Sequence, residues 1–138
     1  MQAEKEMTFR VKPSSEGPIL VSFDEHGGLR YGRVLSELSV APVLDNPAET
    51  FLYSIGSCMA ISLQKLALRR KIEIQSFHIQ ITGHKGEFLP AHFTHYDIQL
   101  SKGIYSEREL AEKLLKDAKK ICTISNSVSG TFELRLEA

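Results

Sequence analysis

Alternation of apolar and polar positions predicts six β-strands in this chain. In the first of them Met7, Phe9 and Val11 alternate with polar side chains, so that one face of the strand would be buried. The same period of two, bounded by turn residues, recurs along the chain. The six predicted strands span residues 5–13, 19–23, 29–40, 72–82, 92–101 and 131–137. The first three are separated only by short turns, and they therefore predict an N-terminal β-meander over about 5–40.

A long helix over about 47–70 follows the predicted meander. Asn46 is a preferred N-cap residue, Pro47 suits the first helical position, and Glu49 places a negative charge in the first turn. From Phe51 onwards apolar residues lie on every side of the helix, which is the pattern of a buried helix. A membrane span would need about 20 apolar residues, and this run is shorter. The pattern therefore indicates the core helix of a folded domain.

A second, amphipathic helix is predicted near the C-terminal end of the chain. Ser106 and Glu109 have the S-x-x-E spacing of a capping box, which marks a helix start. The apolar residues that follow recur at helical spacing and predict one buried face: Leu110, Leu114, Leu115, Ala118 and Ile121. The resulting order, β-β-β-α-β-β-α-β, is typical of an α+β fold with mostly antiparallel pairing. We expect one domain over 1–138, with its β-β-α-β part over about 72–137.

The long helix is difficult to bury within a single chain of this size. A helix that is apolar all round needs neighbours on every side, and one small α+β layer covers only part of it. Packing against a second copy of the chain would cover the remainder. The sequence therefore predicts an obligate homodimer with a large apolar interface.

Charge and composition narrow the classes of partner. The chain has 17 basic and 17 acidic residues, so its net charge supports neither a nucleic-acid surface nor an anionic-membrane surface. The N-terminal residues show no apolar run with a cleavage pattern, and we therefore expect a cytoplasmic protein. In a reducing cytoplasm a structural disulfide between Cys58 and Cys122 is not expected. Two interpretations of the cysteines stay open: two buried thiols, or a redox pair.

The histidines do not predict a metal site when each strand is considered alone. His92 and His95 fall on opposite faces of one predicted strand, and His78, on the strand 72–82, and His84, in the turn that follows it, are likewise not placed to share an ion. Phosphate-binding glycine loops and a nucleophile-elbow motif are also absent from the sequence. We therefore expect neither a metal nor an organic cofactor.

Two motifs carry a resemblance to a known family. The first is N-P-A-E-x-F-L-x-x-x-G-S-C-M-A-x-S-L in the long helix, and the second is I-C-T-I-S-N-S near the end of the second helix. Together with the element order they resemble the osmotically inducible protein C and organic hydroperoxide resistance proteins, the OsmC/Ohr family. The resemblance covers about residues 40–138 well. It implies an OsmC-like fold in which antiparallel sheets surround the central helix of an intertwined homodimer.

The same resemblance implies a peroxiredoxin-like activity. Family members characterised as enzymes reduce organic hydroperoxides, and an external dithiol then reduces the protein. Carried over by position, Cys58 resembles the peroxidatic cysteine and Cys122 the resolving cysteine, which implies a disulfide between them during turnover. Glu49 resembles the glutamate at the helix start. An arginine of the meander completes the family's site, and we assign this role to Arg30, with Arg33 as the alternative.

The proposed roles agree with thiol chemistry. A peroxidatic thiol must ionise, and a neighbouring guanidinium favours the thiolate. A carboxylate would hold that guanidinium in place. Glu49 and Cys58 lie nine residues apart, about 13.5 Å along an unbroken helix, so Glu49 would reach the Cys58 of a partner subunit rather than its own. Simple capping of the first turn remains an alternative role for Glu49.

The sequence also departs from the family pattern at two points. Thr123 stands where the family has a proline after the second cysteine, and the linker before the long helix lacks a glycine-rich run. The first departure concerns the mobility of Cys122, and the second concerns access to the site. Apolar walls from Phe51, Ile55 and Ile61 would suit an alkyl hydroperoxide. Two other functions stay open: an apolar-ligand-binding protein with poorly activated thiols, and a structural dimer module.

Overall fold

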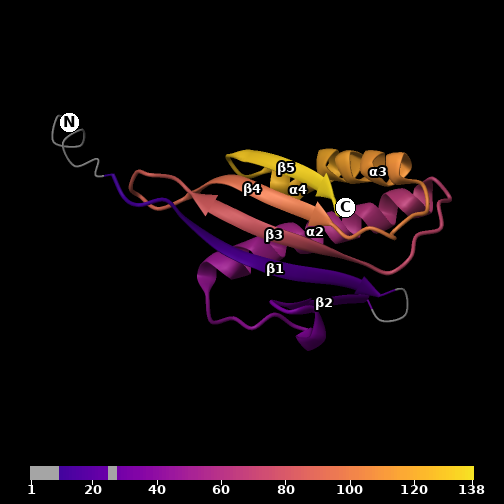
Figure 1. Cartoon of the computed structure of the whole chain (residues 1–138), viewed down its shortest axis with the longest axis horizontal. Coiled ribbons are helices and arrows are strands. Elements are labelled where there is room, and N and C mark those ends of the chain that lie inside the picture. The colour runs from indigo at the N-terminus through magenta and orange to yellow at the C-terminus, as the bar shows by residue number, and fades with distance from the viewer. Residues whose placement is uncertain (1–9, 25–27) are drawn as a thin grey trace.

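A five-stranded sheet with helices on one face forms the architecture of this α+β chain (Figure 1). The computed structural model describes residues 10–24 and 28–138. The strands are β1 (Ser14–Asp24), β2 (Gly28–Gly32), β3 (Phe77–Lys85), β4 (Phe93–Leu100) and β5 (Thr131–Leu136), in the spatial order β2-β1-β3-β4-β5. The helices are the 3-10 turn η1 (Leu35–Glu37), α2 (Pro47–Arg69), α3 (Arg108–Ile121) and α4 (Thr123–Asn126).

The sheet is mixed, because its last strand runs parallel to its neighbour. The pairs β1–β2, β1–β3 and β3–β4 are antiparallel, whereas β4 and β5 pair in parallel from His95↔Thr131 to Leu100↔Leu136. The prediction of antiparallel sheets is therefore wrong for β5. The reason is the connection, since α3 and α4 carry the chain back to the end at which β4 began.

The N-terminal meander differs from its prediction in three places. Most of the predicted strand 5–13 lies outside the described residues, and Arg10 forms only an isolated bridge with Phe88. The predicted turn at 14–17 is instead the first part of β1, where Ser14 pairs with Lys85 of β3. The third predicted strand ends early, at Gly32, and η1 follows. Pairing partners supplied by β3 override the turn propensity of these polar residues.

Helix α2 begins as the sequence predicted. Oδ1 of Asn46 accepts hydrogen bonds from the backbone N–H groups of Ala48 and Glu49 at 2.9 and 3.2 Å, and Pro47 occupies the first helical position. These bonds satisfy two of the donors that a helix leaves free at its start. The predicted span of 47–70 is confirmed to within one residue.

One side of α2 forms the centre of the core. Its buried residues pack on β1 and β3 and against α3: Leu52, Tyr53, Ile55, Gly56, Met59, Ala60, Leu63, Leu66 and Ala67. By length and composition alone α2 could cross a membrane. However, 56% of its most apolar 18-residue stretch is buried inside the protein, as is usual for a core helix. Within one chain the helix is not covered all round, because Ile61 and Leu68 remain 41% and 79% exposed.

Helix α3 covers the C-terminal part of α2 and one edge of the sheet. It begins after Glu107 and has no side-chain cap, so the predicted Ser106 cap is wrong. The guanidinium of Arg108 instead donates to the backbone carbonyl groups of Leu136 and Glu137, which attaches the start of α3 to the end of β5. The predicted apolar stripe is confirmed for Leu114, Leu115 and Ala118, whereas Leu110 and Ile121 are exposed.

Candidate functional site

Cys58 lies at the middle of α2, half-buried at the wall of a hollow of about 580 Å³. The hollow lies between α2 and the segment that joins α3 to α4. Its lining residues are Ser54, Ser57, Cys58, Ile61, Ser62, Lys65, Arg69, Ile121, Thr123 and Ile124. Solvent and a small substrate can therefore approach Cys58 from the side of α2 that faces away from the sheet.

Cys122 occupies the junction between α3 and α4 and is fully buried. Its sulfur accepts a hydrogen bond from the backbone N–H of Ser125 at 3.5 Å, and the Ser125 hydroxyl donates to the Cys122 carbonyl at 3.2 Å. Burial raises the pKa of the Cys122 thiol, and a hydrogen bond with the Cys58 side chain raises it further, against the opposing effect of Ser125. Cys122 is therefore held as a protonated thiol at neutral pH.

The fold brings the two cysteines into contact. Each thiol lies on a different element, Cys58 on α2 and Cys122 at the start of α4, and α4 packs directly against α2. The Cys58 side chain is one of the groups that raise the pKa of Cys122, which places the two thiols next to one another. Of the two, only Cys58 also reaches the hollow, so the pair has one accessible and one sheltered thiol.

Glu49 forms the second part of the candidate site. It lies in the first turn of α2, whereas Cys58 lies at the middle of the same helix. Its carboxylate is almost fully buried, and Oε1 accepts a hydrogen bond from Nε of Arg33 at 2.7 Å. The Arg33 guanidinium also contacts Asp45 at 2.7 Å. The hydrogen bonds with Glu49 and then Asp45 raise the pKa of Arg33 above its ordinary value. The guanidinium is thus a permanent cation, held between two carboxylates.

Arg33, not Arg30, pairs with Glu49. Residues of β2 alternate between the two faces of the sheet, and Tyr31 packs towards α2. Arg30 therefore lies on the opposite face, where it is the register partner of Ser22. Arg33 lies beyond the end of β2, in the segment that leads to η1, and can turn back to α2. The structure thus pairs Glu49 with Arg33, the alternative, rather than with Arg30, to which the site role was assigned; which guanidinium acts on Cys58 stays a prediction.

The Arg33–Glu49 pair does not lie beside the Cys58 of its own chain. Helix α2 is continuous from Pro47 to Arg69, so Glu49 and Cys58 are separated by about 13.5 Å along its axis. The cations of the hollow, Lys65 and Arg69, lie about 10 and 16 Å beyond Cys58 along the same helix. The nearest arginine to Cys58 along α2 is therefore Arg69, about three turns away.

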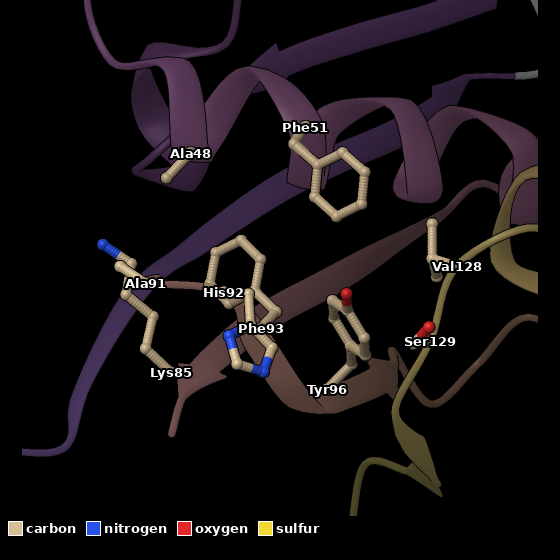
Figure 2. A pocket seen from close by; sticks show the side chains of 9 residues that line it. All are labelled: Ala48, Phe51, Lys85, Ala91, His92, Phe93, Tyr96, Val128 and Ser129. Atoms are coloured by element: carbon tan, nitrogen blue, oxygen red, sulfur yellow. The ribbon is translucent and has the colours of Figure 1, made fainter. Parts of the chain in front are cut away.

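An apolar pocket of about 560 Å³ lies at the N-terminal end of α2 (Figure 2). Phe51 of α2 projects over Phe93 and Tyr96 of β4, and Val128 borders them from the loop before β5. The rings of Phe51 and Phe93 are stacked with centroids 5.9 Å apart. His92 and Lys85 provide polar groups at the wall. The pocket combines an aromatic wall with one cationic side chain.

Sequence reasoning missed two contributors and misplaced one. Asp45 accepts a hydrogen bond from Arg33, as Glu49 does, and directly precedes the cap residue Asn46. No sequence pattern links the positions of Asp45 and Arg33. Ser125 is buried beside Cys122 and falls inside the second motif, I-C-T-I-S-N-S, but no role was assigned to it from the sequence. Ile55 is fully buried in the core, so it does not form the expected wall of a substrate site. Thr123, the departure from the family's proline, opens α4 and lines the hollow.

The sequence profile of the OsmC-like protein family matches residues 45–137, which is more than half of the chain. This chain is a member of the OsmC-like family. The matched region includes α2, both cysteines and β3 to β5. The predicted family and the α+β OsmC-like fold are thereby confirmed.

Proteins similar to this OsmC-like protein include one uncharacterised relative and two solved structures. The uncharacterised protein YmaD of Bacillus subtilis is 28% identical over 124 residues, which cover 81% of this chain and 83% of YmaD. The organic hydroperoxide resistance protein OhrB of Bacillus subtilis has a similar structure, with a TM-score of 0.52, 20% identity and coverage of 94% of this chain and 97% of OhrB. An organic hydroperoxide resistance protein OsmC from Legionella pneumophila has a TM-score of 0.58 at 14% identity, covering 93% and 98% of the two chains. These structures support the fold.

Proposed function

We propose that this OsmC-like protein is a thiol-dependent peroxidase that reduces organic hydroperoxides. The contact between the accessible Cys58 and the sheltered Cys122 is the single observation that carries the proposal. A pair of this kind can form a disulfide within one chain. The structural relatives named as organic hydroperoxide resistance proteins support the same chemistry.

The proposed cycle begins with attack of the Cys58 thiolate on the outer oxygen of the hydroperoxide. The O–O bond breaks, Cys58 becomes a sulfenic acid, and the alkoxide leaves as an alcohol after taking up a proton. The Cys122 sulfur then attacks the Cys58 sulfenic sulfur, which forms the disulfide and releases water. An external dithiol reduces this disulfide and is itself oxidised to a disulfide, which restores both thiols.

The active unit in this proposal is a homodimer. Ile61 lies near Cys58 on the side of α2 that the sheet does not cover. Ile61 is 41% exposed and Leu68 is 79% exposed. A second copy packed on this side would bury both residues. If the two α2 helices run antiparallel, the Arg33–Glu49 pair of one subunit approaches the Cys58 of the other. The guanidinium would then favour the thiolate and stabilise the leaving oxygen, while Glu49 positions it.

Peroxidase assays of cysteine variants test this proposal. The full chain is supplied with cumene hydroperoxide and a small dithiol, and hydroperoxide consumption is followed over many turnovers. Cys58→Ser should lose turnover completely while keeping a normal circular dichroism spectrum, because a hydroxyl cannot replace the thiolate. Lys116→Ala, exposed on α3 and outside the hollow, is the control and should keep full activity. Full turnover by Cys58→Ser would refute the proposal.

The aromatic pocket favours a second candidate function, binding of an apolar ligand. Its wall of Phe51, Phe93 and Tyr96 suits an acyl chain, and Lys85 could contact a carboxylate head group (Figure 2). Native mass spectrometry of the protein purified from cells would detect a retained fatty acid. A retained ligand together with no hydroperoxide turnover in the wild type would favour this function over the peroxidase.

A further inference from the structure

Four side chains with metal-binding groups meet on the sheet face that points away from α2 and α3. His84 of β3 and His95 of β4 are direct register partners, and Asp97 of β4 is the register partner of Glu133 of β5. Their neighbours in each strand, such as Tyr96, point into the core, so alternation sends all four to the outer face. Three adjacent strands thus contribute two imidazoles and two carboxylates to one patch.

The distances within this patch are short. Nε2 of His95 lies 3.2 Å from Oδ1 of Asp97 and 3.8 Å from Oε1 of Glu133. Nε2 of His84 lies 2.7 Å from the other oxygen of Asp97, Oδ2. The ligand atoms of His95, Asp97 and Glu133 all lie within 4.8 Å of one another. Two carboxylates therefore converge on one imidazole nitrogen, an arrangement that a bound cation would stabilise.

The spacing suits a small divalent cation. Zinc binds nitrogen and carboxylate oxygen at about 2.0–2.2 Å, so ligand atoms at the corners of a tetrahedron are about 3.3–3.6 Å apart. The separations of 3.2 and 3.8 Å bracket this range. Calcium and magnesium prefer oxygen ligands, whereas imidazole selects zinc, nickel, cobalt or copper.

The surrounding groups orient the ligands as they do in metal sites. Nδ1 of His95 lies 2.6 Å from the hydroxyl oxygen of Thr131, which holds the imidazole ring with Nε2 towards the carboxylates. A hydroxyl or carbonyl partner on the second ring nitrogen is usual for a metal-binding histidine. The cluster is only partly covered, with exposed side-chain fractions of 34% for His95 and 26% for Asp97, so an ion can reach it.

We propose that His95, Asp97 and Glu133 form a binding site for a zinc-like divalent transition-metal ion, with His84 as the fourth ligand. His84 reaches the ion by exchanging its hydrogen bond with Asp97 for a metal bond. The site would connect β3, β4 and β5 across the parallel β4–β5 junction. It is separate from the proposed thiol chemistry, since the sheet lies between this patch and Cys58. The sequence alone predicted no metal site, because only the strand register brings His84 and His95 together.

Metal titration of the chelator-treated, phosphine-reduced full chain tests the site. Isothermal titration with Zn²⁺ should show one site in the wild type, and His95→Gln and Glu133→Gln should each weaken it at least about tenfold. Glu133 has a 55% exposed side chain, so its variant is expected to fold normally even if His95→Gln does not. His78→Gln, on the same face of β3 but outside the cluster, is the matched control and should bind Zn²⁺ like the wild type.

Co²⁺ spectra distinguish this site from the cysteines. Cobalt bound through histidine and carboxylate shows only visible d–d bands, whereas cobalt bound to thiolate adds an intense near-ultraviolet charge-transfer band. We expect d–d bands alone, lost in Glu133→Gln. Three results would each overturn the proposal: absence of Zn²⁺ binding in the wild type, equal affinity in Glu133→Gln, or a dominant thiolate band. In those cases the cluster is held by hydrogen bonds alone, such as those of Asp97 with His84 and His95.

Discussion

Nε of Arg33 donates a hydrogen bond to Oε1 of Glu49 at 2.7 Å, and this links the segment after β2 to the first turn of α2. The Glu49 side chain is only 10% exposed, so the carboxylate lies within protein and its interaction with the guanidinium is only weakly screened. Capping at this helix end is performed by Asn46, whose side chain accepts the free backbone donors. The Glu49 side chain is therefore available to position Arg33.

Glu49→Gln should lower kcat/KM for organic hydroperoxides by about tenfold or more, because a charge-assisted hydrogen bond to Arg33 becomes a neutral one. The matched control is Asp45→Asn, since Asp45 also contacts Arg33 but has a 60% exposed side chain. It should retain most of the activity. Steady-state assays with cumene hydroperoxide compare the two variants. A larger loss of kcat/KM in Asp45→Asn than in Glu49→Gln would contradict this prediction.

Mixed dimers extend the same prediction to a shared site. A heterodimer of one Glu49→Gln subunit and one Cys58→Ser subunit keeps one intact site, built from Glu49 of the second and Cys58 of the first. It should be more active than either parent homodimer. Activity no better than that of the parents would refute the shared site. A monomer in sedimentation at micromolar concentration would refute the dimer as well.

Cys122→Ser should consume about one equivalent of hydroperoxide per chain and then stop. The Cys58 sulfenic acid forms normally, but the thiol that contacts it in the wild type is gone, and over-oxidation follows. Rapid-mixing assays with mass spectrometry of the intact chain would show the added oxygen atoms. Sustained turnover at the wild-type rate would mean that Cys122 is only a core residue.

Gly56→Ala should destabilise the fold although alanine favours helices. A methyl group at this position would lie 2.6 Å from Cγ2 of Val21 and 2.8 Å from Cδ1 of Ile81, so these side chains or the helix would have to shift. Overpacking of this kind costs about 1–3 kcal/mol, against a gain in helix propensity of about 1 kcal/mol or less. Urea unfolding should give a lower free energy of unfolding than for the wild type. Ser54→Ala, exposed on the same helix, should give no loss.

Asp117 should make stability depend on pH below about 4. The hydrogen bonds first with Arg70 and then with Lys113 lower the pKa of Asp117 below its ordinary value of 3.8. A depressed folded-state pKa gives stability that is complete above 3.8 and is lost as the pH falls through the folded value. Asp117→Asn should therefore be less stable than the wild type at pH 6, and the difference in urea midpoint should shrink towards pH 3. A difference that stays constant with pH would contradict this role.

Local signals in the sequence were sufficient for the presence of the two long helices and for the family. The cap at Asn46, the Pro47 start and the apolar run around Cys58 all act within a few residues, so α2 was predicted almost to the residue. The same helix carries most of the first family motif, which explains why the family was recognisable before the fold was known. Period-two alternation likewise predicted β3, β4 and β5.

Pairings between distant segments were decided only by the tertiary structure. The parallel direction of β5 follows from the course of α3 and α4, and the contact of Cys58 with Cys122 follows from the packing of α4 on α2. Which arginine meets Glu49, and which histidine faces His95, depend on strand register and on the face to which each side chain points. Period and propensity describe one segment at a time, whereas these relationships depend on how two segments align, and a shift of one residue would reverse them.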